Sequence, residues 1–174
     1  MGNWINSCKC RNLVQKRTSK DITCYKVIER RNGKAYSLFG WGIYKDGVKE
    51  GTLLIPEEKI KHNNWIKRIL FNKPKVEKIP HSITYNKERN WYDITWGFIH
   101  SLPYNIEGKL KQYIPIDCKG TFELWECIIP KGTVYYQADV RGSHYEASYS
   151  YASKQLKFIR MIESIKYKGY FNEE

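Results

Sequence analysis

The chain has 174 residues, of which 41% are hydrophobic and 15% aromatic, and a chain of this length can bury a core without disulfides. Lysine and arginine number 30 against 18 aspartate and glutamate residues, so the formal net charge is +12. This composition excludes a disordered chain, collagen and a coiled coil, and no apolar run reaches the roughly 18 residues of a membrane span.

The N-terminal segment is basic. Residues 1–20 carry no acidic side chain and five basic ones, which are Lys9, Arg11, Lys16, Arg17 and Lys20. Large apolar residues are few there, so we expect a basic arm or a short helix over residues 1–20. A single globular domain is expected over 21–166, followed by a tail over 167–174.

The cysteines favour reduced thiols. There are five, and the run from Met1 to Cys10 lacks the apolar segment of a signal peptide. We therefore expect a cytoplasmic protein without disulfides. Cys8-Lys-Cys10 has neither the spacing nor the nearby histidines of a zinc site, so we expect no metal and no other cofactor.

A hairpin is the clearest element of the first half. Ile22 to Ile28 is rich in β-branched and aromatic residues, and Ala35 to Phe39 forms a second short apolar run. Asn32-Gly33 lies between them and suits the positive φ angles of a type I′ turn. This arrangement predicts antiparallel strands over about 22–29 and 35–40.

The middle of the chain carries weaker signals. A short apolar strand is expected at 52–55, and the apolar spacing over 59–71 indicates a basic amphipathic helix. Alternation over 91–100 predicts one strand that ends at His100. Residues 105–113 are expected to form a short helix with Asn105 as its N-cap.

Strands dominate the C-terminal third. We expect one strand over residues 121–129, a turn at Pro130-Lys-Gly132, and the partner strand over 133–138. Another strand is expected over 155–162. The fold class that follows is mostly β or α+β. It is a single domain of about six to eight antiparallel strands with one or two peripheral helices.

Two groups of residues are candidates for binding. A predicted loop holds Arg141, His144 and Glu146, which offer a phosphate-binding guanidinium, an imidazole and a carboxylate, and His100 could join them from its strand. The alternative is a polar surface loop. The second group belongs to the basic segment 59–78, where we expect a positive face with Lys59, Lys61, Lys67 and Arg68.

The partner is expected to be acidic. Basic residues interleaved with aromatics, as in the run from Lys166 to Phe171, suit nucleic acid, but no RNA-recognition signature is present. An acidic protein surface and nucleic acid both remain candidate partners, a membrane is not expected, and the sequence leaves the oligomeric state open. No motif of a hydrolase, kinase or dinucleotide-binding enzyme occurs.

The C-terminal third contains Cys127-Ile-Ile-Pro-Lys-Gly-Thr133, then Tyr135-Tyr136 and later Tyr151-Ala-Ser153. This pattern resembles a group of small proteins of bacteriophages and of bacteria that carry phage genes. Cys24-Tyr-Lys-Val27 fits the same group, whereas Ile99 interrupts its usual Gly-Phe-His motif. The resemblance implies a virion component or a host-directed factor, such as an inhibitor of host defence, rather than an enzyme.

A weaker similarity is to the ADP-ribosyltransferase-like fold, which often carries a Pro-Lys-Gly turn after a central strand. The early-strand Arg or His of that fold is replaced by Tyr25-Lys26-Val27, and the late strand begins Ala152-Ser153-Lys154 without its Glu. We therefore expect a non-catalytic binding or structural protein with an acidic or phosphate-bearing partner. The alternative is an ADP-ribosyltransferase-like enzyme or nucleotide-binding protein that uses the loop from Arg141 to Glu146.

Overall fold

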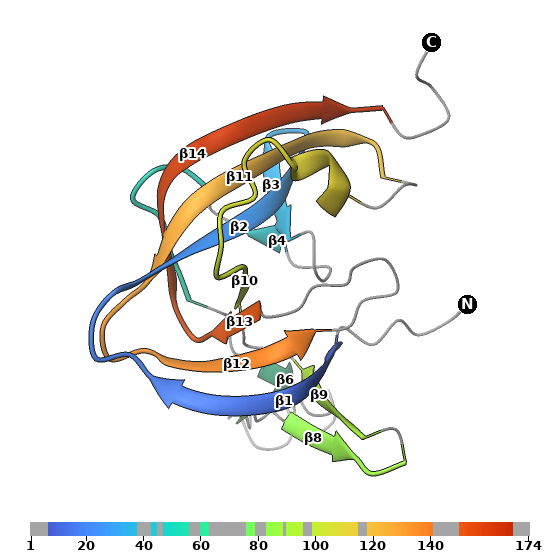
Figure 1. Ribbon diagram of the computed structural model, residues 1–174, viewed down its shortest axis with the longest axis vertical. Helices are drawn as coiled ribbons and strands as arrows, with labels where there is room; N and C mark the ends of the chain where they lie inside the picture. Colours follow the sequence, from blue (N-terminus) through green and yellow to red (C-terminus); the bar gives the residue numbers. More distant parts are fainter. Residues whose placement is uncertain are drawn as a thin grey trace, which may run out of the picture.

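The protein consists mainly of two facing antiparallel β-sheets, as seen in the computed structural model (Figure 1). The structure describes residues 7–37, 43–44, 47–55, 60–62, 76–78, 83–88, 90–95, 99–114, 118–140 and 150–168. Sheet A has the strand order β10-β13-β12-β1-β9-β8, and sheet B has the order β4-β3-β2-β11-β14-β5. The expected mostly β, antiparallel fold class is confirmed.

Each sheet combines strands from both halves of the chain. Sheet A contains β1 (Ser7–Arg17), β8 (Ile83–Asn86), β9 (Trp91–Thr95), β10 (Ile99–Ser101), β12 (Val134–Val140) and β13 (Ser150–Ser153). Sheet B contains β2 (Ile22–Arg31), β3 (Lys34–Ser37), β4 (Ile43–Tyr44), β5 (Leu53–Leu54), β11 (Gly120–Ile129) and β14 (Leu156–Tyr167). A separate pair is formed by β6 (Ile60–His62) and β7 (Val76–Lys78).

The predicted Asn-Gly hairpin is confirmed. β2 and β3 are antiparallel, and Arg31 lies opposite Lys34 at the turn. Asn32 and Gly33 both have positive φ angles, 49° and 75°, as a type I′ turn requires. The turn thus sets the register of these two strands from local sequence alone.

One corner joins the two sheets. The chain crosses from β1 to β2, from β11 to β12 and from β13 to β14 at the same end, on the left of Figure 1. Thr18 binds this corner together, because its N–H donates to Thr133 O at 3.0 Å and its hydroxyl donates to Pro130 O at 2.7 Å. Gly132 N donates back to Thr18 O at 2.9 Å.

Apolar side chains fill the space between the sheets and also the other face of sheet B. The first core joins residues of both sheets, including Ile28, Trp125 and Phe158 from sheet B and Ile99 and Tyr135 from sheet A. The second core lies under residues 102–114, which include the short 3-10 helix η1 (Leu110–Tyr113). The central strands of sheet B are therefore covered on both faces.

The structure differs from two expectations about the first half of the chain, at residues 7–17 and 60–62. The N-terminal segment forms no helix or arm over 7–17 but the strand β1, which pairs with β12 and β9. Successive side chains of a strand point to opposite faces, and residues 14–17 are all exposed, so a polar sequence suits both faces of this part of β1. Residues 60–62 of the expected amphipathic helix are strand β6, and 63–71 lie outside the described residues.

Three further expectations need correction. Residues 91–100 are not one strand, because β9 and β10 occupy different places in sheet A. The helix expected over 105–113 is confined to η1, and Asn105 instead accepts a hydrogen bond from Glu107 N at 3.0 Å. β11 and β12 do not pair as a hairpin, because the turn at Pro130 leads the chain from one sheet to the other.

Candidate anion-binding site

The inner face of sheet B changes from apolar to charged along its strands. Cross-strand neighbours share a face, so the register of β2, β11 and β14 defines rows of side chains. Near the corner one row holds Cys24, Cys127 and Phe158, and the next holds Lys26, Trp125 and Met161. Farther from the corner, the third row holds Ile28, Glu123 and Ser164, and the fourth holds Arg30, Thr121 and Lys166.

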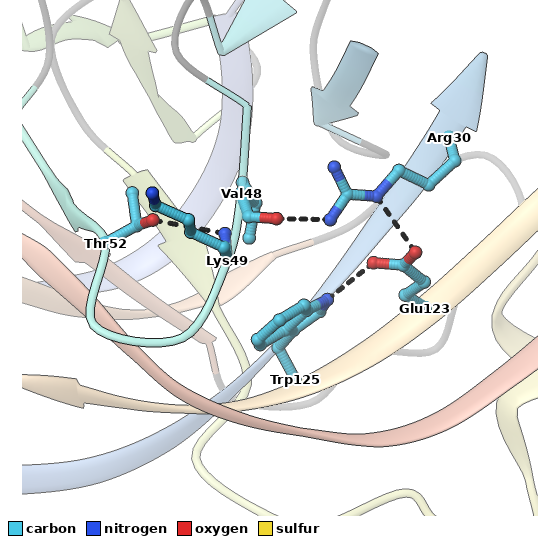
Figure 2. Close-up of polar contacts among 6 residues, drawn as sticks. All are labelled: Arg30, Val48, Lys49, Thr52, Glu123 and Trp125. Carbon is cyan, nitrogen blue, oxygen red and sulfur yellow. Dashed lines mark hydrogen bonds and ion pairs between the residues drawn. The ribbon is translucent and has the colours of Figure 1, made fainter. Parts of the chain in front are cut away.

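Glu123 holds the charged end of this face together (Figure 2). Its carboxylate accepts a hydrogen bond from Arg30 Nε at 2.9 Å and another from Trp125 Nε1 at 2.8 Å. Arg30 Nη2 also donates to the backbone oxygen of Val48. The Arg30 side chain remains 23% exposed and Glu123 11%, so the guanidinium is oriented by the protein while it still reaches solvent.

Other carboxylates are also bound internally. Glu29 is buried and accepts hydrogen bonds from Arg31, one of them at 2.7 Å from Nη2. Glu126 pairs with Arg160 at 2.7 Å, and Glu163 accepts a hydrogen bond from Gly108 N at 2.9 Å. Glu29 and Glu126 are each paired with an arginine, so their negative charge is held within the fold rather than presented alone to solvent.

The exposed surface reflects this internal use of acids. Among the residues whose side-chain exposure the structure describes, the exposed acidic ones are Asp21, Glu50, Glu88 and Glu107. The exposed basic side chains are far more numerous: Lys16, Arg17, Lys20, Arg31, Lys34, Lys49, Lys87, Lys109, Lys111, Lys119, Lys131, Lys157, Arg160, Lys166 and Lys168. Such an imbalance produces a positive potential that attracts polyanions.

Five of these cations gather at the end of sheet B that lies away from the corner. We call this surface the basic end; it consists of Arg31, Lys34, Lys119, Lys166 and Lys168, all of them exposed. Arg31 and Lys34 flank the β2–β3 turn, Lys119 precedes β11, and Lys166 and Lys168 lie where β14 ends. Register brings these ends together, because Thr121 lies opposite both Arg30 and Lys166.

Gly120 allows the acid behind the basic end to approach closely. A Cβ atom at Gly120, whose φ is 155°, would lie 3.0 Å from Glu29 Oε1. A side chain at this position would therefore push against the carboxylate that holds Arg31. Gly120 thus helps to fix the position of one cation of the basic end.

Lys26 is a second, buried cation on the same face. It is 1% exposed, and its Nζ donates to the backbone oxygen of His100 at 2.7 Å and to Ser37 Oγ at 3.3 Å. Burial of a charge is costly unless hydrogen bonds compensate for it. Lys26 therefore ties β2 to β3 and to β10, in addition to the main-chain bonds between Tyr25 and Leu102.

The groups around Lys26 are held in their neutral forms. Burial raises the pKa of the Cys24 thiol to about 12, although the Ser101 hydroxyl and Lys26 partly oppose the rise. Burial also raises the pKa of Cys127, the cross-strand neighbour of Cys24. Burial lowers the pKa of His100 to about 4, and the charge of Lys26 contributes to that shift.

His100 is the one predicted ligand-binding residue whose side chain the structure describes. Its Nδ1 is buried and has no hydrogen-bond partner among the described residues. Arg141, His144 and Glu146 lie outside the described residues, as do Lys59, Lys67 and Arg68. Lys61 belongs to strand β6, and its side chain is also outside the described part.

Sequence reasoning missed the basic end because its cations come from three separated segments of the chain. Each lies at an end of a strand, and strands were predicted over much of β2, β11 and β14, but only the pairing of these three strands brings the segments together. A local signal did exist at the hairpin, where the Asn-Gly turn is flanked by Arg31 and Lys34.

The described part of the chain offers no clear metal site or membrane span. Its His, Cys, Asp and Glu side chains form no group of three or more that could hold a metal ion. Helical segments in the same part are too short or too polar to cross a membrane.

Comparison of the chain with protein-family models, with curated proteins and with solved structures finds no match.

Proposed function

We propose that this protein is a non-catalytic binding protein that engages an acidic or phosphate-bearing partner through the basic end of sheet B. The resemblance to small phage-type proteins suggests a virion component or a host-directed factor. The observation that supports the proposal most is the clustering of Arg31, Lys34, Lys119, Lys166 and Lys168 over carboxylates that are already paired inside.

The chemistry of the basic end suits binding of an anion rather than catalysis. Exposed ammonium groups attract carboxylates and phosphates, but each exposed pair is worth only about 0–1 kcal/mol, so several must act together. Arg31 is held in place by Glu29, and its guanidinium lies 5.4 Å from the centre of the Tyr36 ring. A positioned guanidinium loses less conformational entropy on binding than a free one.

Charge reversal tests this proposal. The variant carries Lys34→Glu, Lys119→Glu and Lys166→Glu, and the matched control carries Lys20→Glu, Lys87→Glu and Lys131→Glu. All six lysines are exposed, so both triple variants change the net charge equally and leave the core intact. The probes are a 12-residue polyglutamate peptide and a 12-nucleotide oligothymidylate. Fluorescence anisotropy measures the affinity of each protein for each probe over a range of salt concentrations.

We expect the basic-end variant to lose at least about tenfold in affinity for one or both probes, and the control to lose much less. For the oligonucleotide, the slope of log affinity against log salt should fall by about 2, since each neutralised phosphate of a single strand contributes about 0.7. Equal losses in the two triple variants, or no binding by the wild-type protein, would contradict the proposal.

A further inference from the structure

We propose that strand β14 is a docking edge to which an acidic peptide adds as an extra β-strand. The inference deepens the proposed function and rests on it, because it names the partner as an extended acidic segment of a protein. β14 pairs with β11 along its length, but on its other side β5 pairs only with Leu156 and Lys157. Within the described part of the chain, residues 159–167 therefore have no strand on that side.

The free edge begins where a turn leads the chain away. Gly51 N donates to Phe158 O at 2.9 Å, and Phe158 N donates to Thr52 O at 2.8 Å. Thr52 then closes a turn with Lys49: the Thr52 N–H donates to Lys49 O at 3.0 Å, and the Lys49 N–H donates to the Thr52 hydroxyl oxygen at 3.1 Å. The segment that contains β5 thus already adds to this edge of β14, and it stops after Phe158.

Main-chain groups of β14 face outward beyond that point. Phe158 turns its N–H and C=O towards β5, and residues of an antiparallel ladder alternate between their two neighbours. Counted through the two bulges of the β11–β14 ladder, the same outward orientation falls at Met161, Ser164 and Lys166. All three residues are exposed.

The charge of β14 selects the occupant. Lys157, Arg160 and Lys166 are exposed on the strand, and Lys168 follows it. The acidic residue of the strand, Glu163, is already bonded to Gly108 N. A second copy of β14 would set cations beside cations, which destabilises a strand pair, whereas an acidic strand would pair with opposite charges.

A peptide also fits this edge better than a nucleic acid does. The edge alternates N–H donors with C=O acceptors, and an extended peptide offers both kinds of group at the same spacing. A phosphodiester backbone supplies acceptors for the N–H groups but no donors for the carbonyls. Met161, which is 49% exposed, adds an apolar contact that alternate side chains of the peptide could cover.

Ser164→Pro is the central variant of the test. Proline removes the outward N–H at this position without breaking the ladder to β11, as proline on an edge strand can do. Ser164→Ala is the matched control, because it keeps the N–H. The probe is the capped decapeptide of five Val-Glu repeats, and a version with three valines replaced by proline keeps the charge but cannot form a strand.

We expect the Val-Glu peptide to bind the wild-type protein and the Ala variant, and Ser164→Pro to weaken binding at least about tenfold. The proline-containing peptide should bind as weakly. Peptide binding should also slow amide hydrogen exchange at Met161, Ser164 and Lys166. A circular-dichroism melt shows whether the Ser164→Pro variant is folded. If it is not, the amide exchange of the wild-type protein still tests the inference.

Other outcomes separate this inference from the proposed function. Binding of oligothymidylate through the basic end without binding of the Val-Glu peptide would overturn the docking edge and leave the proposed function standing. The docking edge would also be overturned, with the proposed function left standing, if the Val-Glu peptide and its proline-containing version bound equally well. The same holds if the Val-Glu peptide did not slow amide exchange at Met161, Ser164 and Lys166. Failure of every acidic probe to bind would overturn both.

Discussion

Arg30 and Lys166 lie on opposite sides of Thr121, one on β2 and the other on β14, although 135 residues separate them in the sequence. Neither cation has its position set by its immediate neighbours in the chain. The register of three strands aligns them, and this relationship defines the charged end of sheet B.

Loss of Glu123 should loosen this end of the sheet. Glu123→Ala leaves Arg30 Nε and Trp125 Nε1 without their acceptor, while Glu123→Gln keeps a neutral acceptor. We expect a loss of about 2 kcal/mol in the free energy of unfolding for Ala and about half of that for Gln. Urea unfolding measures both, and Glu88→Ala, on an exposed turn, is the control that should change by less than about 0.5 kcal/mol.

Removal of the Lys26 side chain should be more costly. Lys26→Ala creates a cavity and leaves the backbone oxygen of His100 without its donor, whereas Lys26→Met fills most of the same volume. We expect Ala to lower the free energy of unfolding by about 3 kcal/mol and Met to lower it by less. Equal effects of the two substitutions would show that the amine, rather than the packing, determines the cost.

The stability of the protein should fall in acid because of His100. Its pKa is about 4 in the folded protein against 6.5 as an ordinary histidine, so the unfolded chain takes up a proton that the folded chain excludes. The contribution is fully present above pH 6.5 and decreases as the pH falls towards 4, by on the order of 3 kcal/mol. His100→Gln should flatten the pH dependence of urea unfolding over this range; an unchanged profile would contradict the burial of His100.

Cys24 and Cys127 should be unreactive in the folded protein. Burial raises the pKa of both thiols, so thiolate is scarce at pH 8, and both side chains are inaccessible. Alkylation by iodoacetamide, followed site by site with mass spectrometry, should modify these two cysteines only as fast as the protein unfolds. Because the folded pKa of Cys24 lies above its ordinary value of 9.0, stability should also decrease as the pH rises above about 9.

Local sequence predicted the parts of the fold that local chemistry determines. Asn32 and Gly33 specify their turn by their own backbone preferences, so the hairpin could be predicted without any knowledge of the partner sheet. Pro130-Lys-Gly132 was also identified as a turn, but whether a turn continues one sheet or changes to another depends on contacts such as that of Thr18 with Thr133. Those contacts join residues more than a hundred positions apart.

The candidate site could not be predicted for the same reason. The sequence identified the excess of positive charge but assigned it to the density of basic residues along the chain, and three of the four candidates named in the segment 59–78, Lys59, Lys67 and Arg68, lie outside the described part. Glu29 and Glu123 are buried and paired with arginines, so they do not present their negative charge at the surface where the lysines of the basic end are exposed. Neither the burial nor the pairing is visible in composition or spacing.

The central claim, that the basic end binds an acidic partner, is tested most directly by mapping amide chemical shifts during titration with the 12-residue polyglutamate peptide. We predict that the largest changes fall at Arg31, Lys34, Lys119 and Lys166 and disappear as salt is added, since the attraction is electrostatic. Changes centred on Lys87 and Glu88 at the β8–β9 turn, or spread evenly over all exposed lysines, would contradict the account.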